Sequence, residues 1–517
     1  MGNMDSMVEQ LSSRHRWLIL VVMTGSLAMI MMDTTVVGVA LATIGEELGL
    51  DETTQAWVVN AYLLAMASLI ALGGRIGDLI GKALAFRIGV SVFALSSLGC
   101  GLAESGSMLI GFRIVQAVGA VLMQPASSAM VVSVAEPGRE GRFMGFYIGI
   151  SMLGLVAGPV LGGVIATHLG WSWIFYVNLP IAAFALLMTF RVRLPALRDP
   201  QKGLDLLSVL LVVVSLPLCI GFLQQAGRWG FLDPRTLAGV GIGFAGLVFF
   251  VRRQGRVARP LVNLELLRDR GFLTDAAMLG LIQFALTGTA IQLPILTQAT
   301  WGFDAQQAGL ATLPLVVPVV FLVQVAGRLY DRFGVRRLAI PAAVISSLSV
   351  VLLGLAAINR SLPMLFTGML VLGISMPFVS MPANTDGMRR VGQARRGIAS
   401  GLIQTVRMTG STVGVAVTAA IAANFEIGAD ALARLDCGDV ASETIQRAAS
   451  GDPKAFASVA AVMPTGSDCL DVIRQGISNG IGWGFVVAGI VASMSVFAAI
   501  RWQPGEDDPH SESSRGL

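Results

Sequence analysis

Long apolar stretches recur along the whole chain and are separated by short polar segments. Each is roughly as long as a bilayer is thick, since ~20 helical residues cover a hydrocarbon core of ~30 Å. They lack the polar faces that buried helices of a large soluble protein would carry. The pattern predicts an all-α integral membrane protein with fourteen transmembrane helices, at 17–41, 55–74, 83–103, 108–133, 143–167, 172–190, 204–223, 236–251, 273–297, 307–327, 338–357, 362–385, 397–424 and 476–500.

Lysine and arginine fall mainly on one side of this predicted topology. With the N-terminus inside, 27 of the 36 Lys and Arg residues lie in inner loops and tails, 7 lie outside and 2 lie within spans. Such an excess of positive charge is typical of cytoplasmic loops. We therefore expect a multi-pass protein of the cytoplasmic (inner) membrane with both termini cytoplasmic.

A short motif occurs twice, 253 residues apart, after the second and the tenth spans: Gly74, Arg75, Asp78 and Gly81 recur as Gly327, Arg328, Asp331 and Gly334. Transporters are commonly built from repeats that move about a central site. Because the offset is eight spans, we expect two six-helix halves with two helices inserted between them. The expected parts are an N-tail at 1–16, a six-helix bundle at 17–190, inserted helices and linker at 191–272, a second six-helix bundle at 273–500 with an outer loop at 425–475, and a C-tail at 501–517.

The composition agrees with a membrane protein and disfavours several other classes. Only 13% of residues are charged, against about 25% in soluble proteins. A net charge of +4 is too small to indicate nucleic-acid binding, and the four cysteines show no CxxC spacing that would indicate a metal site. A phosphate-binding loop around Gly81-Lys82 lacks its required glycine and its Ser or Thr. We therefore expect no enzyme, no metal and no cofactor.

Asp33 lies within the first span and Arg113 within the fourth. Charged residues inside transmembrane helices are expensive and usually face a cavity or a partner charge. Counting residues from the helix ends gives the two side chains similar depths, so an ion pair between them is expected. Such a carboxylate could bind a proton, or a substrate cation, in one conformation and release it in another. A static salt bridge that orients the helices is the alternative.

These residues resemble motifs of the major facilitator superfamily, in particular of its fourteen-span drug:proton antiporter branch. The first span matches at Asp33-Thr34-Thr35, and the fourth at Arg113 and Gln116. The fifth span carries the whole antiporter motif: Gly154, Gly158, Pro159, Gly162 and Gly163. The loop motif matches at Gly74, Arg75, Asp78, Gly81 and Lys82, and its second copy includes Asp331 and Arg332.

The resemblance implies a proton-coupled antiporter that exports amphipathic, often cationic drugs by alternating access, driven by the proton gradient. It further implies that the glycine face of the fifth span packs against the C-terminal half, and that Asp78 and Asp331 latch an inner gate. Dedicated export of one metabolite, lipid or siderophore is the alternative. The expected partners are small amphipathic substrates, protons and the bilayer. We expect a monomer, and a periplasmic or outer-membrane partner is left open.

Polar residues within or near the spans are candidates for a substrate cavity: Asn60, Tyr62, Gln116, Gln283, Gln292, Gln298 and Arg407. Each could equally form an interhelical hydrogen bond. For Arg407, lining the cavity and pairing with a helix end are both open. In the outer loop, Cys437 and Cys469 could form a disulfide or remain two free thiols.

Overall fold

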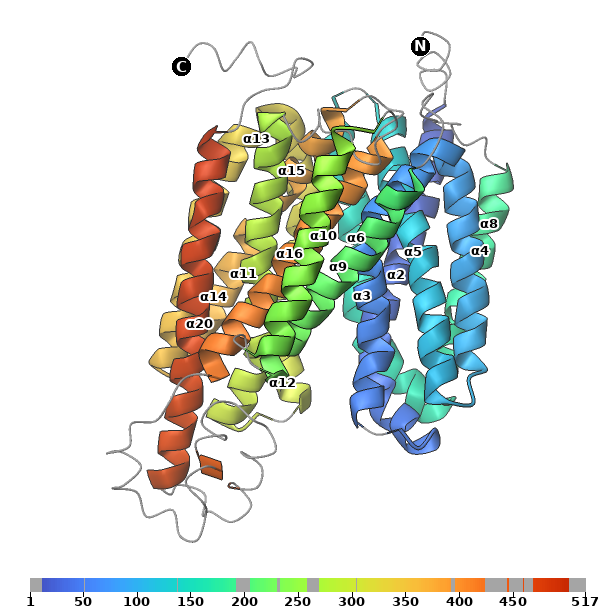
Figure 1. Cartoon of the computed structure of the whole chain (residues 1–517). Helices are drawn as coiled ribbons and strands as arrows, with labels where there is room; N and C mark the ends of the chain where they lie inside the picture. The colour runs from blue at the N-terminus through green and yellow to red at the C-terminus, as the bar shows by residue number, and fades with distance from the viewer. Residues whose placement is uncertain are drawn as a thin grey trace.

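The structure is a computed structural model that describes residues 12–50, 52–136, 138–191, 205–229, 233–257, 269–303, 305–391, 396–423, 444–445, 459 and 468–501. This part of the chain is helical throughout and contains no strand (Figure 1). Its helices are α2 Ser13–Glu47, α3 Glu52–Ile80, α4 Lys82–Gly101, α5 Gly106–Val134, α6 Glu140–His168, α7 Trp173–Tyr176, α8 Asn178–Arg191, α9 Leu206–Trp229, α10 Pro234–Gln254, α11 Arg270–Trp301, α12 Ala305–Ala311, α13 Leu313–Ile358, α14 Leu362–Ser375, α15 Pro377–Arg389, α16 Arg396–Ala423 and α20 Asp468–Arg501.

Ten helical stretches in the described residues are long and apolar enough to cross a membrane. One of them, α13, is 46 residues long and contains the non-helical residue Gly334, where two helices join at a kink. Gly334 has a φ of 74°, a conformation that glycine adopts without a Cβ penalty. The second copy of the repeated motif therefore ends at this turn. Gly81, the corresponding residue of the first copy, lies between α3 and α4 with a φ of 95°.

The helices form two bundles whose internal packing is alike. In the first bundle, Gly154 of α6 lies against the backbone of Ala28 in α2. In the second, Gly410 and Gly414 of α16 lie against Gly280 and Phe284 of α11. Small residues allow such close approach of helices, which is a main source of helix association in a bilayer. The α2–α6 and α11–α16 pairs are thus equivalent contacts in the two halves.

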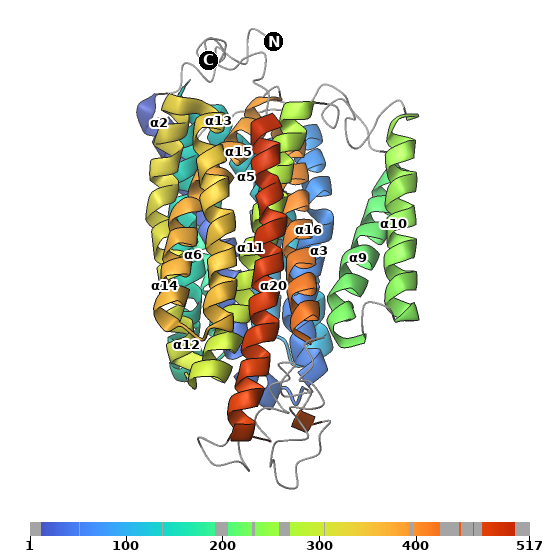
Figure 2. The same cartoon turned by 90° about the vertical axis from the view of Figure 1, so that its left-hand side faces the viewer.

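Helices α9 and α10 form a hairpin at the side of the molecule (Figure 2). Ala67 of α3 packs in one apolar cluster with Val212 and Leu216 of α9, and Leu402 of α16 lies against the same cluster. The base of the hairpin is held by Asp205, which accepts hydrogen bonds from the Arg253 guanidinium at 2.7 and 2.9 Å. These bonds hold the pKa of Asp205 below its ordinary value. The hairpin therefore touches both bundles without entering either.

The α2 start at Ser13 and the α20 end at Arg501 lie at the same end of the bundle, here called the termini end (Figure 1). The other end, where α2 finishes at Glu47, is called the opposite end. The two bundles lie together at the termini end and diverge toward the opposite end. At the termini end, α6 contacts α13 and α3 contacts α16. The two halves are therefore in contact with each other at the termini end.

Candidate functional site

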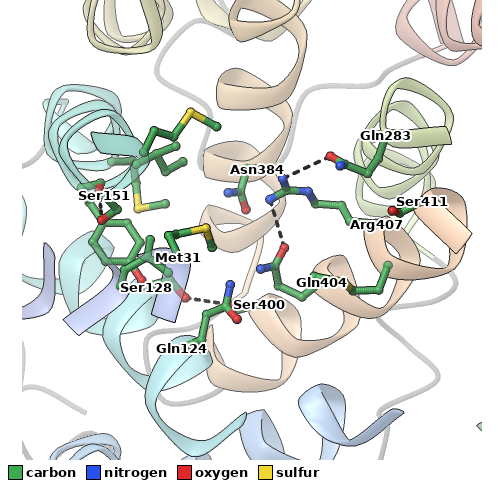
Figure 3. A pocket seen from close by; sticks show the side chains of 16 residues that line it. Met31, Gln124, Ser128, Ser151, Gln283, Asn384, Ser400, Gln404, Arg407 and Ser411 are labelled. Atoms are coloured by element: carbon green, nitrogen blue, oxygen red, sulfur yellow. Dashed lines mark hydrogen bonds between the residues drawn. The ribbon is translucent and has the colours of Figure 1, made fainter. Parts of the chain in front are cut away.

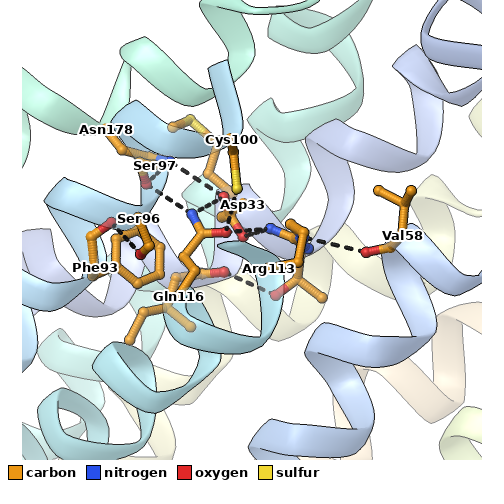
Figure 4. A network of polar contacts seen from close by, with 12 residues as sticks. Asp33, Val58, Phe93, Ser96, Ser97, Cys100, Arg113, Gln116 and Asn178 are labelled. Carbon is orange, nitrogen blue, oxygen red and sulfur yellow. Dashed lines mark hydrogen bonds and ion pairs between the residues drawn. The ribbon is translucent and has the colours of Figure 1, made fainter. Parts of the chain in front are cut away.

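Asp33 is the centre of a fully buried polar cluster within the first bundle (Figure 4). The Arg113 guanidinium forms an ion pair with Asp33 Oδ2 at 2.5 Å. On the other carboxylate oxygen, Gln116 Nε2 donates at 2.9 Å and Asn178 Nδ2 at 3.2 Å. Ser97 Oγ accepts from both amides, at 2.8 and 3.4 Å. Both carboxylate oxygens of Asp33 are therefore bonded, by groups from α5 and α8.

Arg113 is held by more than its ion pair. Its Nε donates to the Val58 carbonyl at 3.3 Å, and one of its Nη nitrogens also donates to Gln116 Oε1 at 2.7 Å. The guanidinium carbon lies 4.1 Å from the centre of the Tyr62 ring and 5.9 Å from that of Phe175. Such cation–π contacts compensate in part for the lost hydration of the guanidinium. A change in the charge of Asp33 would therefore alter the contacts among α2, α3, α5 and α8.

A separate cavity of about 160 Å³, lined by polar and apolar side chains, lies between the two bundles (Figure 3). Its described lining comes from α2, α5 and α6 of the first bundle and from α11, α15 and α16 of the second: Leu27, Met31, Gln124, Ser128, Met144, Tyr147, Ile148, Ser151, Met152, Gln283, Asn384, Ser400, Gln404, Arg407, Met408 and Ser411. Ser128 and Ser400 join the two halves by a hydrogen bond of 2.6 Å. A ligand here would touch both halves at once.

The predicted cavity residues divide into three groups. Gln283 and Arg407 line the cavity between the bundles. Tyr62 and Gln116 are fully buried in or against the Asp33 cluster instead. Asn60, Gln292 and Gln298 belong to neither set of residues: Asn60 and Gln298 are exposed and Gln292 is buried.

Asp33 itself does not line this cavity, although Met31, two residues earlier on α2, does. The expectation that Asp33 attracts a substrate cation directly therefore has no support in the cavity geometry. Met31 and Asp33 are close in sequence, however, so α2 contributes to both the cavity and the Asp33 cluster. The carboxylate and the cavity therefore lie on the same helix but do not share one space.

The two aspartates of the repeated motif each cap a helix of the opposite half. Asp78 Oδ2 accepts from the Ile398 N–H at 2.8 Å, in the first turn of α16. Asp331 accepts from the N–H groups of Gly141 and Arg142, at 2.8 and 2.9 Å, in the first turn of α6. Helix N-termini favour a negative charge and leave their first N–H groups without partners in the helix. These reciprocal caps join the halves at the termini end.

The other residues of the predicted gate motif are distributed around these caps. Lys82 forms a buried ion pair with Asp78 at 2.9 Å. Arg75 is buried, whereas Arg332 is exposed and stacks on Phe333. Gly74 is buried as well.

The glycine face of the antiporter motif packs within its own half. Gly154 lies against Ala28, Gly158 against Thr35 and Gly162 against Val36, all three partners on α2. The expectation that this face packs against the C-terminal half is wrong in this structure. A motif on one helix identifies a close contact but not the partner helix. Gly163 has further contacts, and the Pro159 side chain lies outside the described residues.

A second row of α6 glycines forms the contact between the halves, and sequence reasoning missed it. Gly141 lies against Gly327 and Tyr330 of α13, and Gly145 and Gly149 lie against the next two turns of the same helix. The three glycines are four residues apart and so share one helix face. This spacing in the sequence could have predicted a close helix–helix contact on that face.

A cluster of acids around Arg390 lies at the termini end of the second bundle. Arg390 forms ion pairs with Asp386 at 2.8 Å and Asp275 at 3.2 Å. Arg389 reaches Glu140 of α6 at 4.0 Å.

Sequence reasoning also missed Asn178 and Ser97 of the Asp33 cluster. Asn178 could have been found as an isolated amide within an apolar stretch.

Two cysteines of the four are free thiols, Cys100 and Cys219. Cys469 is disulfide-bonded. Its predicted partner, Cys437, lies outside the described residues, as does most of the predicted outer loop. No group of His, Cys, Asp and Glu that could hold a metal ion occurs among the residues the structure describes.

Two related helical bundles around a central cavity, closed at one end, are typical of the class of secondary membrane transporters. The chain belongs to the Major Facilitator Superfamily, whose family pattern matches residues 23–415. It is 30% identical over 412 residues to the multidrug resistance protein Stp of Mycobacterium tuberculosis, covering 78% of this chain and 76% of that protein. It is 26% identical over 511 residues to the tetracenomycin C resistance and export protein of Streptomyces glaucescens, covering 95% and 92%.

The fold agrees with that of a solved member. The structure of the proton:xylose symporter XylE superposes with a TM-score of 0.61 at 16% sequence identity, over 96% of this chain and 97% of that chain. The protein is therefore a multi-pass membrane transporter with the major-facilitator fold. Its family consists of transporters and not of enzymes.

Proposed function

We propose that this protein is a proton-coupled antiporter that exports amphipathic drugs by alternating access. One observation carries the proposal: a cavity between two bundles is closed at one end, and α2, which lines it, also carries the buried Asp33 that pairs with Arg113. Relatives named for drug resistance and export support the substrate class. No cofactor is part of the proposal, and the energy comes from the proton gradient.

The proposed topology has fourteen spans in the order six, two, six. Helices α2 to α6 and the α7–α8 pair supply six, and α9 and α10 are the inserted two. The second six are α11, the two parts of α13, α14 with α15, α16 and α20. The positive-inside bias supports a cytoplasmic location for the termini end, and we propose that the protein lies in the cytoplasmic (inner) membrane. The closed end is then cytoplasmic, and we propose that the monomer is the working unit.

The proposed coupling runs through Asp33. Protonation would remove the negative charge that holds Arg113, Gln116 and Asn178 around it. An unpaired buried guanidinium is strongly unfavourable, so the helices that carry these groups would rearrange. Because α2 lines the cavity at Leu27 and Met31, such a rearrangement changes the cavity as well. Each proton that enters supplies about 2.3 kcal/mol per 100 mV of membrane potential.

Amphipathic compounds fit the lining, which alternates amide and hydroxyl groups with methionines. Methionine side chains adapt to differently shaped apolar ligands. The sequence predicted substrates that are often cationic. We do not propose cationic substrates, because the described lining includes one guanidinium and no carboxylate.

Uptake of fluorescent drugs into inside-out vesicles tests the proposal. We expect several unrelated amphipathic compounds to accumulate when the lumen is acidic, and the accumulation to collapse when a protonophore removes the gradient. Accumulation that survives the protonophore would contradict proton coupling. Transport of a single compound from a broad panel would instead support dedicated export of one metabolite, lipid or siderophore.

A further inference from the structure

We propose that the cavity between the bundles selects amphipathic anions, and that Arg407 binds the anionic group. This inference rests on the proposed export function and names its substrate class. It starts from the charge of the cavity. Among the described residues that line it, Arg407 is charged, and none is an Asp or Glu.

The contacts of Arg407 leave most of its donors available. One Nη donates to Gln404 Oε1 at 3.0 Å, and the other donates to Gln283 Oε1 at 3.3 Å. Both acceptors are neutral amides, and the guanidinium lies between them beside Asn384 (Figure 3). A guanidinium has five N–H donors in a planar fork. Arg407 therefore presents several oriented donors and forms no ion pair within the described part of the chain.

The nearby acids are engaged elsewhere. Asp33 is fully buried in its own cluster, with its ion pair to Arg113. Asp275 and Asp386 both pair with Arg390 at the termini end. None of these carboxylates belongs to the described cavity lining. The positive charge of the cavity is thus not balanced by a carboxylate of the described lining.

A guanidinium in a low-dielectric site is strongly stabilised by an anion that it contacts directly. A cation placed beside it would be repelled instead. Arginine matches planar or forked oxyanions better than lysine does, because its donors form two parallel hydrogen bonds. Carboxylates and sulfonates are therefore the favoured groups. The apolar body of such a compound would lie on Met31, Met144, Met152 and Met408.

Two naphthalene dyes that differ mainly in one charged group test this inference. 8-Anilino-1-naphthalenesulfonate is an amphipathic anion, and N-phenyl-1-naphthylamine is its neutral counterpart. Binding is measured by fluorescence on the full chain in nanodiscs, with the signal of empty nanodiscs subtracted. We expect the wild type to bind the sulfonate roughly tenfold more tightly than the neutral dye, as a charge-assisted hydrogen bond implies.

Arg407→Gln is expected to weaken sulfonate binding roughly ten- to hundredfold and to change neutral-dye binding by less than about twofold. Ser411→Asp, which adds a carboxylate to the cavity lining, is expected to weaken sulfonate binding by a similar factor; it serves as the independent variant if Arg407→Gln does not fold. Arg407→Lys should retain part of the preference. Arg235→Gln, at an exposed position on α10, is the matched control and should leave both affinities unchanged.

Equal binding of the two dyes to the wild type would overturn the inference. So would an equal loss of both dyes in Arg407→Gln, which would show a structural role. Gradient-driven uptake in inside-out vesicles is measured separately. An absent anion preference with intact uptake contradicts this inference alone, whereas an intact anion preference without gradient-driven uptake contradicts the proposed function alone.

Discussion

Among single residues, Asp33 and Arg113 together contact four helices of the first bundle, α2, α3, α5 and α8. The carboxylate receives donors from α5 and α8, and Arg113 in turn contacts α3 through the Val58 carbonyl. A buried ion pair is weak evidence for stability, because desolvation opposes the Coulomb attraction. In the proposed mechanism, binding of a proton to Asp33 removes the Coulomb attraction to Arg113 and leaves the desolvation cost of the guanidinium.

Removal of Arg113 is expected to abolish the response of transport to the pH gradient. Arg113→Leu would leave a buried carboxylate with two amide donors, which costs about 3–5 kcal/mol if it stays ionised. The carboxyl group escapes this cost by taking up a proton, so we expect a folded variant that no longer responds to the pH gradient. Thermal unfolding in detergent and gradient-driven uptake check both points. A variant with wild-type coupling would contradict a role for the pair.

The residue-level prediction from sequence succeeded where a charge within an apolar span demanded a partner. Asp33 and Arg113 are such charges, and the structure pairs them. Asn60, Gln292 and Gln298 are not in the described lining of the cavity, and a neutral amide within a span can form hydrogen bonds with many different partners. Which side of a helix faces a cavity depends on the packing of all its neighbours, and no local pattern records that.

At the scale of helices, α6 carries two glycine rows with different partners. Gly154 and its row pack on α2 within the first bundle, whereas Gly141 and its row pack on α13 of the second. The first row therefore packs two helices of one half together, and the second row packs the two halves together at the termini end. The sequence shows both rows but does not tell which contact moves.

Gly141→Ala is expected to open the termini end, because a methyl group there would meet the backbone carbonyl of Gly327. The measurement is labelling of Ser411→Cys, in the cavity lining, by an impermeant maleimide in inside-out vesicles with Cys219→Ser. We expect labelling to rise severalfold. Gly241→Ala, on α10 with no neighbour near its added methyl, is the control. Unchanged labelling in Gly141→Ala would show that this contact does not limit access.

The reciprocal helix caps make a second prediction at this scale. Asp331→Ala leaves the first N–H groups of α6 without their acceptor, and Asp78→Ala does the same for α16 and also removes the ion pair with Lys82. Loss of a cap costs about 0.5–2 kcal/mol. Both variants should therefore raise the same maleimide labelling, each by a few-fold. An effect of one and not the other would contradict equivalent roles for the two caps.

The helical elements themselves were well anticipated, because long apolar stretches in a bilayer can only be helices. Their ends were not: α2 runs from Ser13 to Glu47, well beyond the predicted 17–41. Helices continue past the apolar core until a turn or a cap stops them. The repeat was found because a tight turn requires glycine, and Gly81 and Gly334 both adopt positive φ.

At the scale of the whole molecule, an anionic substrate changes how the membrane potential acts. One proton moving in and one monoanion moving out together transfer two positive charges inward. At about 2.3 kcal/mol per charge per 100 mV, ~100 mV supplies about 4.6 kcal/mol. Exchange of a proton for a monovalent cation would transfer no net charge.

A lumen-positive potential without a pH gradient should therefore drive uptake of 8-anilino-1-naphthalenesulfonate into inside-out vesicles. The potential is imposed with potassium and valinomycin, and vesicles that lack the protein are the control. Uptake that depends on the pH gradient and ignores the potential would contradict net transfer of charge.

We propose that Asp33 couples protons to transport without binding the substrate. Transport by Asp33→Asn is measured in proteoliposomes in two modes on one preparation: exchange of labelled for unlabelled substrate without a gradient, and uphill uptake with one. We expect exchange to persist near the wild-type rate and uphill uptake to be lost. Uphill uptake at the wild-type level would contradict this role of Asp33, and so would the loss of both modes in a correctly folded variant.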